Sequence, residues 1–231
     1  MTKLIITGGC SMGDQECSDY KTEGGVTVWP TLVNEITGTE VLNISKQSMS
    51  NDYIENVMFD AILENKDKYD ITVLLYWTEL QRINIFDQDT DFQYTDRHAP
   101  NPLSFYGFDE KTAVKQSFRN IKRIQTICDA FNIPCYHRLA FGLTGNTSCS
   151  GEELGINAMI EEFNLSYFEL YSGRWSNRHN DKISQSQLHG GHPNQQMQYE
   201  IAHMFIETMN GNELFELEKP SEMPVRGFVY D

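Results

Sequence analysis

The chain has 231 residues, of which 39% are hydrophobic and 12% aromatic, and its formal net charge is -15. This length and composition are typical of a folded globular domain with a sizeable core, and they exclude a disordered chain. The excess of acidic residues argues against nucleic acids and anionic membrane surfaces as partners, because charges of the same sign repel each other.

The cysteines and the N-terminus indicate the compartment. The five cysteines are scattered and contain no C-x-x-C pair, which favours reduced thiols and argues against a zinc site. The chain starts without a basic segment and a long apolar run, so we expect no signal peptide and a cytoplasmic protein. No apolar run approaches the ~20 residues of a membrane-spanning helix. The sequence predicts neither a metal nor another cofactor.

The first stretch predicts a buried strand that ends in a glycine-flanked turn. Residues 4–6 (Leu-Ile-Ile) suit a strand buried on both faces. Gly8 and Gly9 allow a tight backbone path, and Ser11 follows in the turn. A serine in this place is either a helix N-cap or a group beyond the carboxyl end of the strand, where open parallel sheets bind ligands.

Helices and strands alternate as the chain continues. Residues 26–36 are mixed, but their apolar residues from Trp29 on lie at helical spacing and predict a helix that Pro30 opens at its first turn; a short strand follows at 40–44. A second helix is predicted over 51–65, and residues 70–77 (DITVLLYW) are the strongest strand in the sequence. This βαβαβ order predicts a parallel sheet with right-handed crossovers.

The alternation stops after the third strand. Residues 84–110 carry charges, aromatics and prolines without a clear period, which predicts an insertion that serves as a lid or a subunit contact. The remaining elements are predicted helices at 111–131, 152–165 and from Pro193 or Asn194 to 209, and strands at 133–141 and 167–175. We expect one domain over 1–211, followed by a C-terminal arm at 212–231. The insertion and the arm are the candidate surfaces for a protein partner or for self-association.

Four polar stretches lie where predicted strands end or where the last helix begins. They are residues 9–11 (GCS), 43–51 (NISKQSMSN), 76–79 (YWTE) and 189–194 (HGGHPN). A doubly wound sheet brings its strand ends to one edge. A serine after the first strand and a histidine before the last helix are therefore expected to meet.

The order and spacing of these stretches resemble the SGNH, or GDSL-like, hydrolase family over nearly the whole chain. The resemblance implies that Ser11 is the nucleophile and His192 the base. It implies oxyanion donors at the backbone N–H groups of Ser11 and Ser48 and at the Thr78 side chain. Ser48 stands where the family has glycine, and the strand end at Thr78 lacks the family's asparagine. His189 stands where the family has the aspartate that orients the base.

The implied fold is a three-layer α/β/α sandwich with a flavodoxin-like, mostly parallel sheet of about five strands. The Ser-Asn-Asp turn at 50–52 and the Trp-Thr pair at 77–78 are also similar to SGNH-like proteins of tailed bacteriophages. A phage origin would place the protein in the virion.

The departures from the family pattern weaken the expected chemistry. A serine hydroxyl is a weak nucleophile until a base takes its proton, and a carboxylate normally orients that base and stabilises its charged form. His189 can orient His192 but stabilises its charge less, and Asp181, Glu200 or Glu79 is a carboxylate that could substitute. The i,i+3 spacing of the two histidines also fits a metal pair, but no helix is predicted around them.

Two functions follow from these observations. The first is a serine ester hydrolase that removes an O-acyl group from a carbohydrate or cleaves a small ester, with no nucleic-acid or membrane partner. The second is a weakened or inactive member of the fold with a glycan-binding or structural role, such as a phage virion component. The altered oxyanion and histidine-orienting positions motivate the second.

Overall fold

The computed structural model describes residues 1–17, 20–21, 25–47, 49–78, 110–140, 162 and 192–211. In these ranges the chain forms one four-stranded sheet, made of β1 (Thr2–Gly9), β2 (Glu40–Asn43), β3 (Tyr69–Trp77) and β4 (Cys135–Leu139). The strands lie in the order β2-β1-β3-β4, and every neighbouring pair is parallel. This confirms the predicted parallel sheet.

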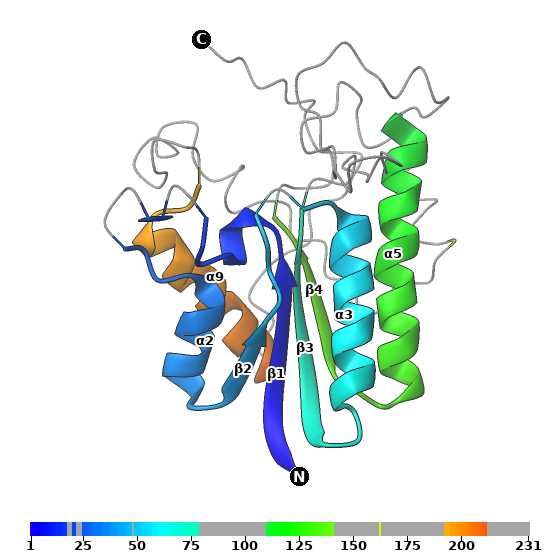
Figure 1. Ribbon diagram of the computed structural model, residues 1–231, viewed down its shortest axis with the longest axis horizontal. Helices are drawn as coiled ribbons and strands as arrows, with labels where there is room; N and C mark the ends of the chain where they lie inside the picture. Colours follow the sequence, from blue (N-terminus) through cyan, green and yellow to red (C-terminus); the bar gives the residue numbers. More distant parts are fainter. Residues whose placement is uncertain are drawn as a thin grey trace.

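Helices cover both faces of the sheet, which gives three layers (Figure 1). The helices α3 (Asn51–Asn65) and α5 (Glu110–Ala130) pack on one face, and α2 (Trp29–Thr37) and α9 (Gln195–Met209) pack on the other. Successive side chains of a strand point to opposite faces. In β1, Leu4 and Ile6 therefore join the α3–α5 core cluster, while Ile5 joins the α2–α9 cluster.

The helix ends follow from local sequence signals. The Ser50 hydroxyl caps α3 by accepting a hydrogen bond from the Tyr53 N–H at 3.3 Å. The Asn194 Oδ1 caps α9 by accepting from the Met197 N–H at 3.1 Å. Gly38 ends α2 with a φ of 65°, a conformation that glycine adopts without strain. The bounds predicted for α3 are those observed, and those predicted for α9 agree within two residues.

The predicted start of α2 agrees with the structure, and the predicted start of β4 was wrong by two residues. The helix that Pro30 was predicted to open begins at Trp29 with Pro30 in its first turn, while Val26 and Val28 before it pack with Tyr20 in a small separate cluster. The strand predicted from 133 begins at Cys135. Before it, the Ile133 N–H still bonds to the Cys128 carbonyl at 2.8 Å and closes the end of α5.

A buried histidine joins β4 to its neighbours. His137 is fully buried, its Nδ1 accepts from the Trp77 Nε1–H at 3.0 Å, and its Nε2 lies 2.9 Å from the Gln125 Oε1. Trp77 can only donate, so the proton of the neutral ring is on Nε2 and is donated to Gln125. Burial, together with the charge of Arg138, lowers the pKa of His137 to about 3.

Several predicted segments lie outside the described residues. Apart from Glu110 and Glu162, they are the insertion at 84–110, the helix at 152–165, the strand at 167–175 and the C-terminal arm at 212–231. None of the helices in the described ranges has the length and apolar character needed to cross a membrane.

Candidate active site

The candidate site lies at the carboxyl edge of the two central strands. The last paired residues of β1 and β3 are Gly9 and Tyr76. Ser11 and Thr78 each follow two residues later, so the sheet register brings them to the same end of neighbouring strands. At this edge the chain leaves β1 through a short 3-10 turn, η1 (Ser11–Gly13) (Figure 1). The structure describes the backbone of Ser11, while its hydroxyl lies outside the described part.

Distant segments hold the turn that carries Ser11. The Met12 carbonyl accepts a hydrogen bond from the Gln198 Nε2 on α9 at 3.0 Å. The Gly13 carbonyl accepts from the Asn43 Nδ2 at the end of β2 at 2.8 Å. The end of β2 and helix α9 therefore both fix this backbone through its carbonyl groups.

The second polar stretch packs directly against the same turn. The Lys46 N–H donates to the Gly9 carbonyl at 3.3 Å, and the Gln47 N–H donates to the Asp14 carboxylate at 2.7 Å. A Cβ on Gly13 would lie 2.5 Å from the Ser45 Oγ, far inside van der Waals contact. Glycine at 13 thus lets the segment after β2 reach the turn.

His192 is connected to this turn through two side chains. Its ring lies edge-on to the Tyr20 ring, with the ring centroids 5.9 Å apart. The Gln198 Nε2 donates to the Tyr20 hydroxyl at 2.8 Å and also to the Met12 carbonyl, next to Ser11. Through these contacts, His192 is linked to the backbone of the residue that follows Ser11.

Gln198 is the centre of this connection. It is fully buried, and its Oε1 accepts from the Trp29 N–H at 2.8 Å while its Nε2 makes the two bonds already described. One side-chain amide thus forms hydrogen bonds with polar groups from three different segments of the chain. Sequence reasoning missed this residue, although a signal was present: Gln198 precedes Ala202 by four positions and Phe205 by seven, in the buried stripe of α9.

Thr78 is held through its backbone while its hydroxyl has no partner in the described part of the chain. The Thr78 N–H donates to the Asn51 Oδ1 at 3.1 Å, and the residue is 1% exposed. Its buried Oγ1 makes no hydrogen bond there. The Asn51 Nδ2 in turn donates to the Ser117 Oγ of α5 at 2.9 Å.

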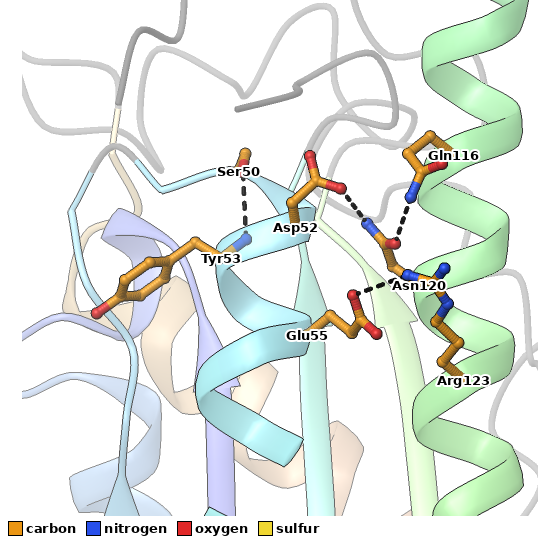
Figure 2. Close-up of polar contacts among 7 residues, drawn as sticks. All are labelled: Ser50, Asp52, Tyr53, Glu55, Gln116, Asn120 and Arg123. Carbon is orange, nitrogen blue, oxygen red and sulfur yellow. Dashed lines mark hydrogen bonds and ion pairs between the residues drawn. The ribbon is translucent and has the colours of Figure 1, made fainter. Parts of the chain in front are cut away.

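Further polar contacts join α3 to α5 beside Asn51 (Figure 2). The Asn120 Nδ2 donates to the Asp52 Oδ1 at 2.9 Å, and the Asn120 Oδ1 accepts from the Gln116 Nε2 at 3.0 Å. One turn further along α3, the Glu55 carboxylate lies 3.5 Å from the Arg123 guanidinium. Burial raises the pKa of Glu55, and Arg123 opposes that shift.

Comparison with known proteins identifies the fold. No protein-family model matches the sequence, and no curated protein sequence matches it either. Among solved structures, the lipase/acylhydrolase from Enterococcus faecalis is similar at 12% identity and a TM-score of 0.52, over 91% of this chain and 96% of that chain. The esterase EstA from a Pseudoalteromonas species is similar at 10% identity and a TM-score of 0.52, over 91% and 98%.

The chain has an SGNH-hydrolase-like fold. A carbohydrate esterase whose active site is described as having divergent catalytic and non-catalytic binding functions is also similar, at 10% identity and a TM-score of 0.50, over 92% of this chain and 69% of that chain. The predicted resemblance is therefore confirmed at the level of the fold.

Two of the predicted SGNH site residues, Ser48 and His189, lie outside the described residues, as do Asp181 and Glu79. Glu200, the third candidate carboxylate, is on α9, where its Oε1 accepts from the Gln196 Nε2 at 3.5 Å. In the described ranges, no group of three or more histidine, cysteine, aspartate or glutamate side chains is arranged to hold a metal.

Proposed function

We propose that this SGNH-fold chain is a serine ester hydrolase, with Ser11 as nucleophile and His192 as general base. The observation that carries the proposal is the connection from the His192 ring through Tyr20 and Gln198 to the Met12 carbonyl. This connection supports the proposal because it links the segment that carries the histidine to the turn that carries the serine, and proton transfer requires the two side chains to be close.

The proposed reaction has two steps. His192 takes the Ser11 hydroxyl proton while the serine oxygen attacks the ester carbonyl carbon, and it then gives that proton to the departing alcohol. Water next attacks the acyl-serine with His192 again as base, which releases the acid and restores the serine. His189 is the proposed orienting group for the second nitrogen of the His192 ring.

The proposed oxyanion donors are the Thr78 hydroxyl and the backbone N–H groups of Ser11 and Ser48. The buried Thr78 Oγ1, unpartnered in the described part of the chain, supports its role because an unused donor at this edge can bond to the developing oxyanion. Removing one such donor typically lowers the rate by about 10²- to 10³-fold.

The proposed substrate is an ester, such as an O-acylated carbohydrate. Proteins of the same fold are named as an acylhydrolase, an esterase and a carbohydrate esterase, which supports this substrate class. The net charge of -15 disfavours strongly anionic substrates.

The second candidate is a binding or structural role, such as carbohydrate recognition in a phage virion. The absence of the family's asparagine near Thr78 and of its aspartate at His189 favours this role. The similar carbohydrate esterase, which is described as having a non-catalytic binding function, offers a precedent in the same fold.

A fluorophosphonate probe separates the two candidates. We expect the probe to label Ser11, as located by peptide mass mapping, and we expect Ser11→Ala to abolish both labelling and hydrolysis of p-nitrophenyl acetate. His192→Gln should slow labelling strongly, whereas His203→Gln, at an exposed position on α9, should not. A folded protein that is never labelled and shows no turnover would favour the binding role.

A further inference from the structure

We propose that Asn51 is a positioning residue for Thr78, through which the α3–α5 helix pair sets the strength of the oxyanion hole. This inference rests on the proposed esterase function and deepens it. It assigns a role to a buried polar group that the reaction itself does not use. The argument starts at the place where β3 stops being held by its neighbours.

The sheet holds β3 as far as Trp77 and no further. The Trp77 carbonyl accepts a hydrogen bond from the Ala140 N–H at 2.8 Å. The next N–H of the chain, that of Thr78, donates to the Asn51 side chain at 3.1 Å instead. Asn51 thus extends the fixed part of the backbone by the one residue that carries the proposed donor.

The Asn51 amide has only one orientation that satisfies the Thr78 N–H and the Ser117 hydroxyl together. Its Oδ1 faces the Thr78 N–H, which can only donate, so the amide oxygen must lie on that side. Its Nδ2 then donates to the Ser117 Oγ at 2.9 Å. Asn51 is fully buried and Ser117 is 1% exposed, so bulk water does not compete for these bonds.

The helix that carries Asn51 is itself rigidly placed. Asn51 is the first residue of α3 and follows the Ser50 cap. The side chains of Ile54 and Met58 anchor the next turns of α3 in the core against β1 and β3. Asn51 therefore relates Thr78 to the packed helix layer as well as to the sheet edge.

Fixing the backbone of Thr78 also restricts its hydroxyl. Threonine is branched at Cβ and has few χ1 rotamers, so a fixed backbone leaves few directions for Oγ1. A donor that must meet a developing oxyanion loses its effect when it is displaced by about 1 Å. Asn51 then affects the rate only through the Thr78 hydroxyl, which distinguishes positioning from general stabilisation.

A double-mutant cycle on kcat/KM for p-nitrophenyl acetate tests this. We expect Thr78→Val to lower kcat by about 10²-fold or more with little change in KM, and Thr78→Ser to retain most of the activity. Asn51→Ala should lower kcat/KM by about tenfold or more in the wild-type protein but by less than about twofold in Thr78→Val. If Asn51→Ala does not fold, Ser117→Ala takes its place in the cycle with the same criterion.

Asn120→Ala is the matched control. Asn120 lies on α5 one turn after Ser117 and is fully buried, and its side chain bonds to Asp52 of α3 and to Gln116 (Figure 2). Its effect should be the same in the presence and absence of the Thr78 hydroxyl. If the wild-type enzyme is active but the effects of Asn51→Ala and Thr78→Val on kcat/KM are additive, the positioning role of Asn51 is refuted. The same holds if Asn120→Ala couples to Thr78→Val as strongly as Asn51→Ala does. Either result would leave the proposed esterase function in place. Absence of wild-type turnover and labelling would overturn the proposed function together with this positioning role.

Discussion

Replacing Thr78 by valine should make the protein more stable and the enzyme slower. The substitution exchanges the hydroxyl for a methyl group of similar size and leaves the backbone bond to Asn51 in place. A buried hydroxyl without a partner destabilises the folded state by about 1–3 kcal/mol, because it loses its hydrogen bonds to water. Thr78 is 1% exposed and its Oγ1 is unpartnered in the described residues, so most of this penalty applies.

We therefore expect Thr78→Val to raise the free energy of unfolding by about 1–2 kcal/mol. For a chain of this size, that corresponds to a Tm increase of about 2–4 °C per kcal/mol. Urea denaturation and thermal unfolding measure the gain, and turnover of p-nitrophenyl acetate measures a loss of about 10²- to 10³-fold.

Thr7→Val is the matched control for this substitution. Thr7 is also fully buried in a strand, but its hydroxyl donates to the Asn43 Oδ1 at 3.2 Å. Removing that donor should lower the free energy of unfolding by about 1 kcal/mol. If Thr78→Val destabilised the protein as much as Thr7→Val does, the Thr78 hydroxyl would be bonded in the native state, and its availability as an oxyanion donor would be refuted.

Three further predictions concern the serine turn and the buried histidine. Gly13→Ala should lower stability by about 1–3 kcal/mol and reduce labelling of Ser11, because the added Cβ overlaps Ser45. Gln198→Leu should cost about 3 kcal/mol or more in urea denaturation and slow labelling, since it removes the partner of three buried groups. The free energy of unfolding should fall by about 1.4 kcal/mol per pH unit from His137 alone as the pH drops from about 6.5 towards 3. In this range His137 binds a proton in the unfolded chain but stays neutral in the folded protein.

A control variant or a contradicting result is available for each of these three predictions. The histidine contribution is the part of the pH dependence that His137→Gln removes, because carboxylates contribute to acid unfolding as well. Equal pH slopes for the two proteins would contradict it. Gly25→Ala, at a glycine with a φ of 79° and nothing within 4 Å of the added Cβ, separates backbone strain from the crowding expected at Gly13. Unchanged labelling of Ser11 in Gln198→Leu would show that the turn does not need its α9 contact.

The sequence was sufficient for the fold because the relevant signals are local. The apolar run at 70–77 predicted β3, which begins one residue earlier at Tyr69. The polar turn before Asn51 supplied the Ser50 cap, so the predicted start of α3 is the observed one. Pro30 predicted the start of α2 because proline suits the first turn of a helix, and it lies in the first turn of the observed helix.

The candidate site was predictable only in part. The positions of Ser11, Thr78 and His192 follow from where strands end and where the last helix begins, because a parallel sheet gathers those points at one edge. The long-range side-chain contacts around these residues do not follow in this way. Gln198 and Met12 are 186 positions apart, and the pairing of Asn51 with Thr78 depends on how α3 packs on the sheet.

The large sequence separation between Met12 and Gln198 also affects the order in which the protein folds during synthesis. The bonds that Gln198 makes to the first turn cannot form until α9, near the end of the described chain, has been synthesised and has docked. Closing a loop of this length costs on the order of 5 kcal/mol of chain entropy, so these contacts are expected late in folding. Chains released before α9 has been made should therefore lack the hydrogen bonds that hold the serine turn. We expect Ser11 to become reactive only after α9 has been synthesised and has docked. Under the proposed mechanism, Ser11 would thus stay unreactive while the rest of the polypeptide is still being made.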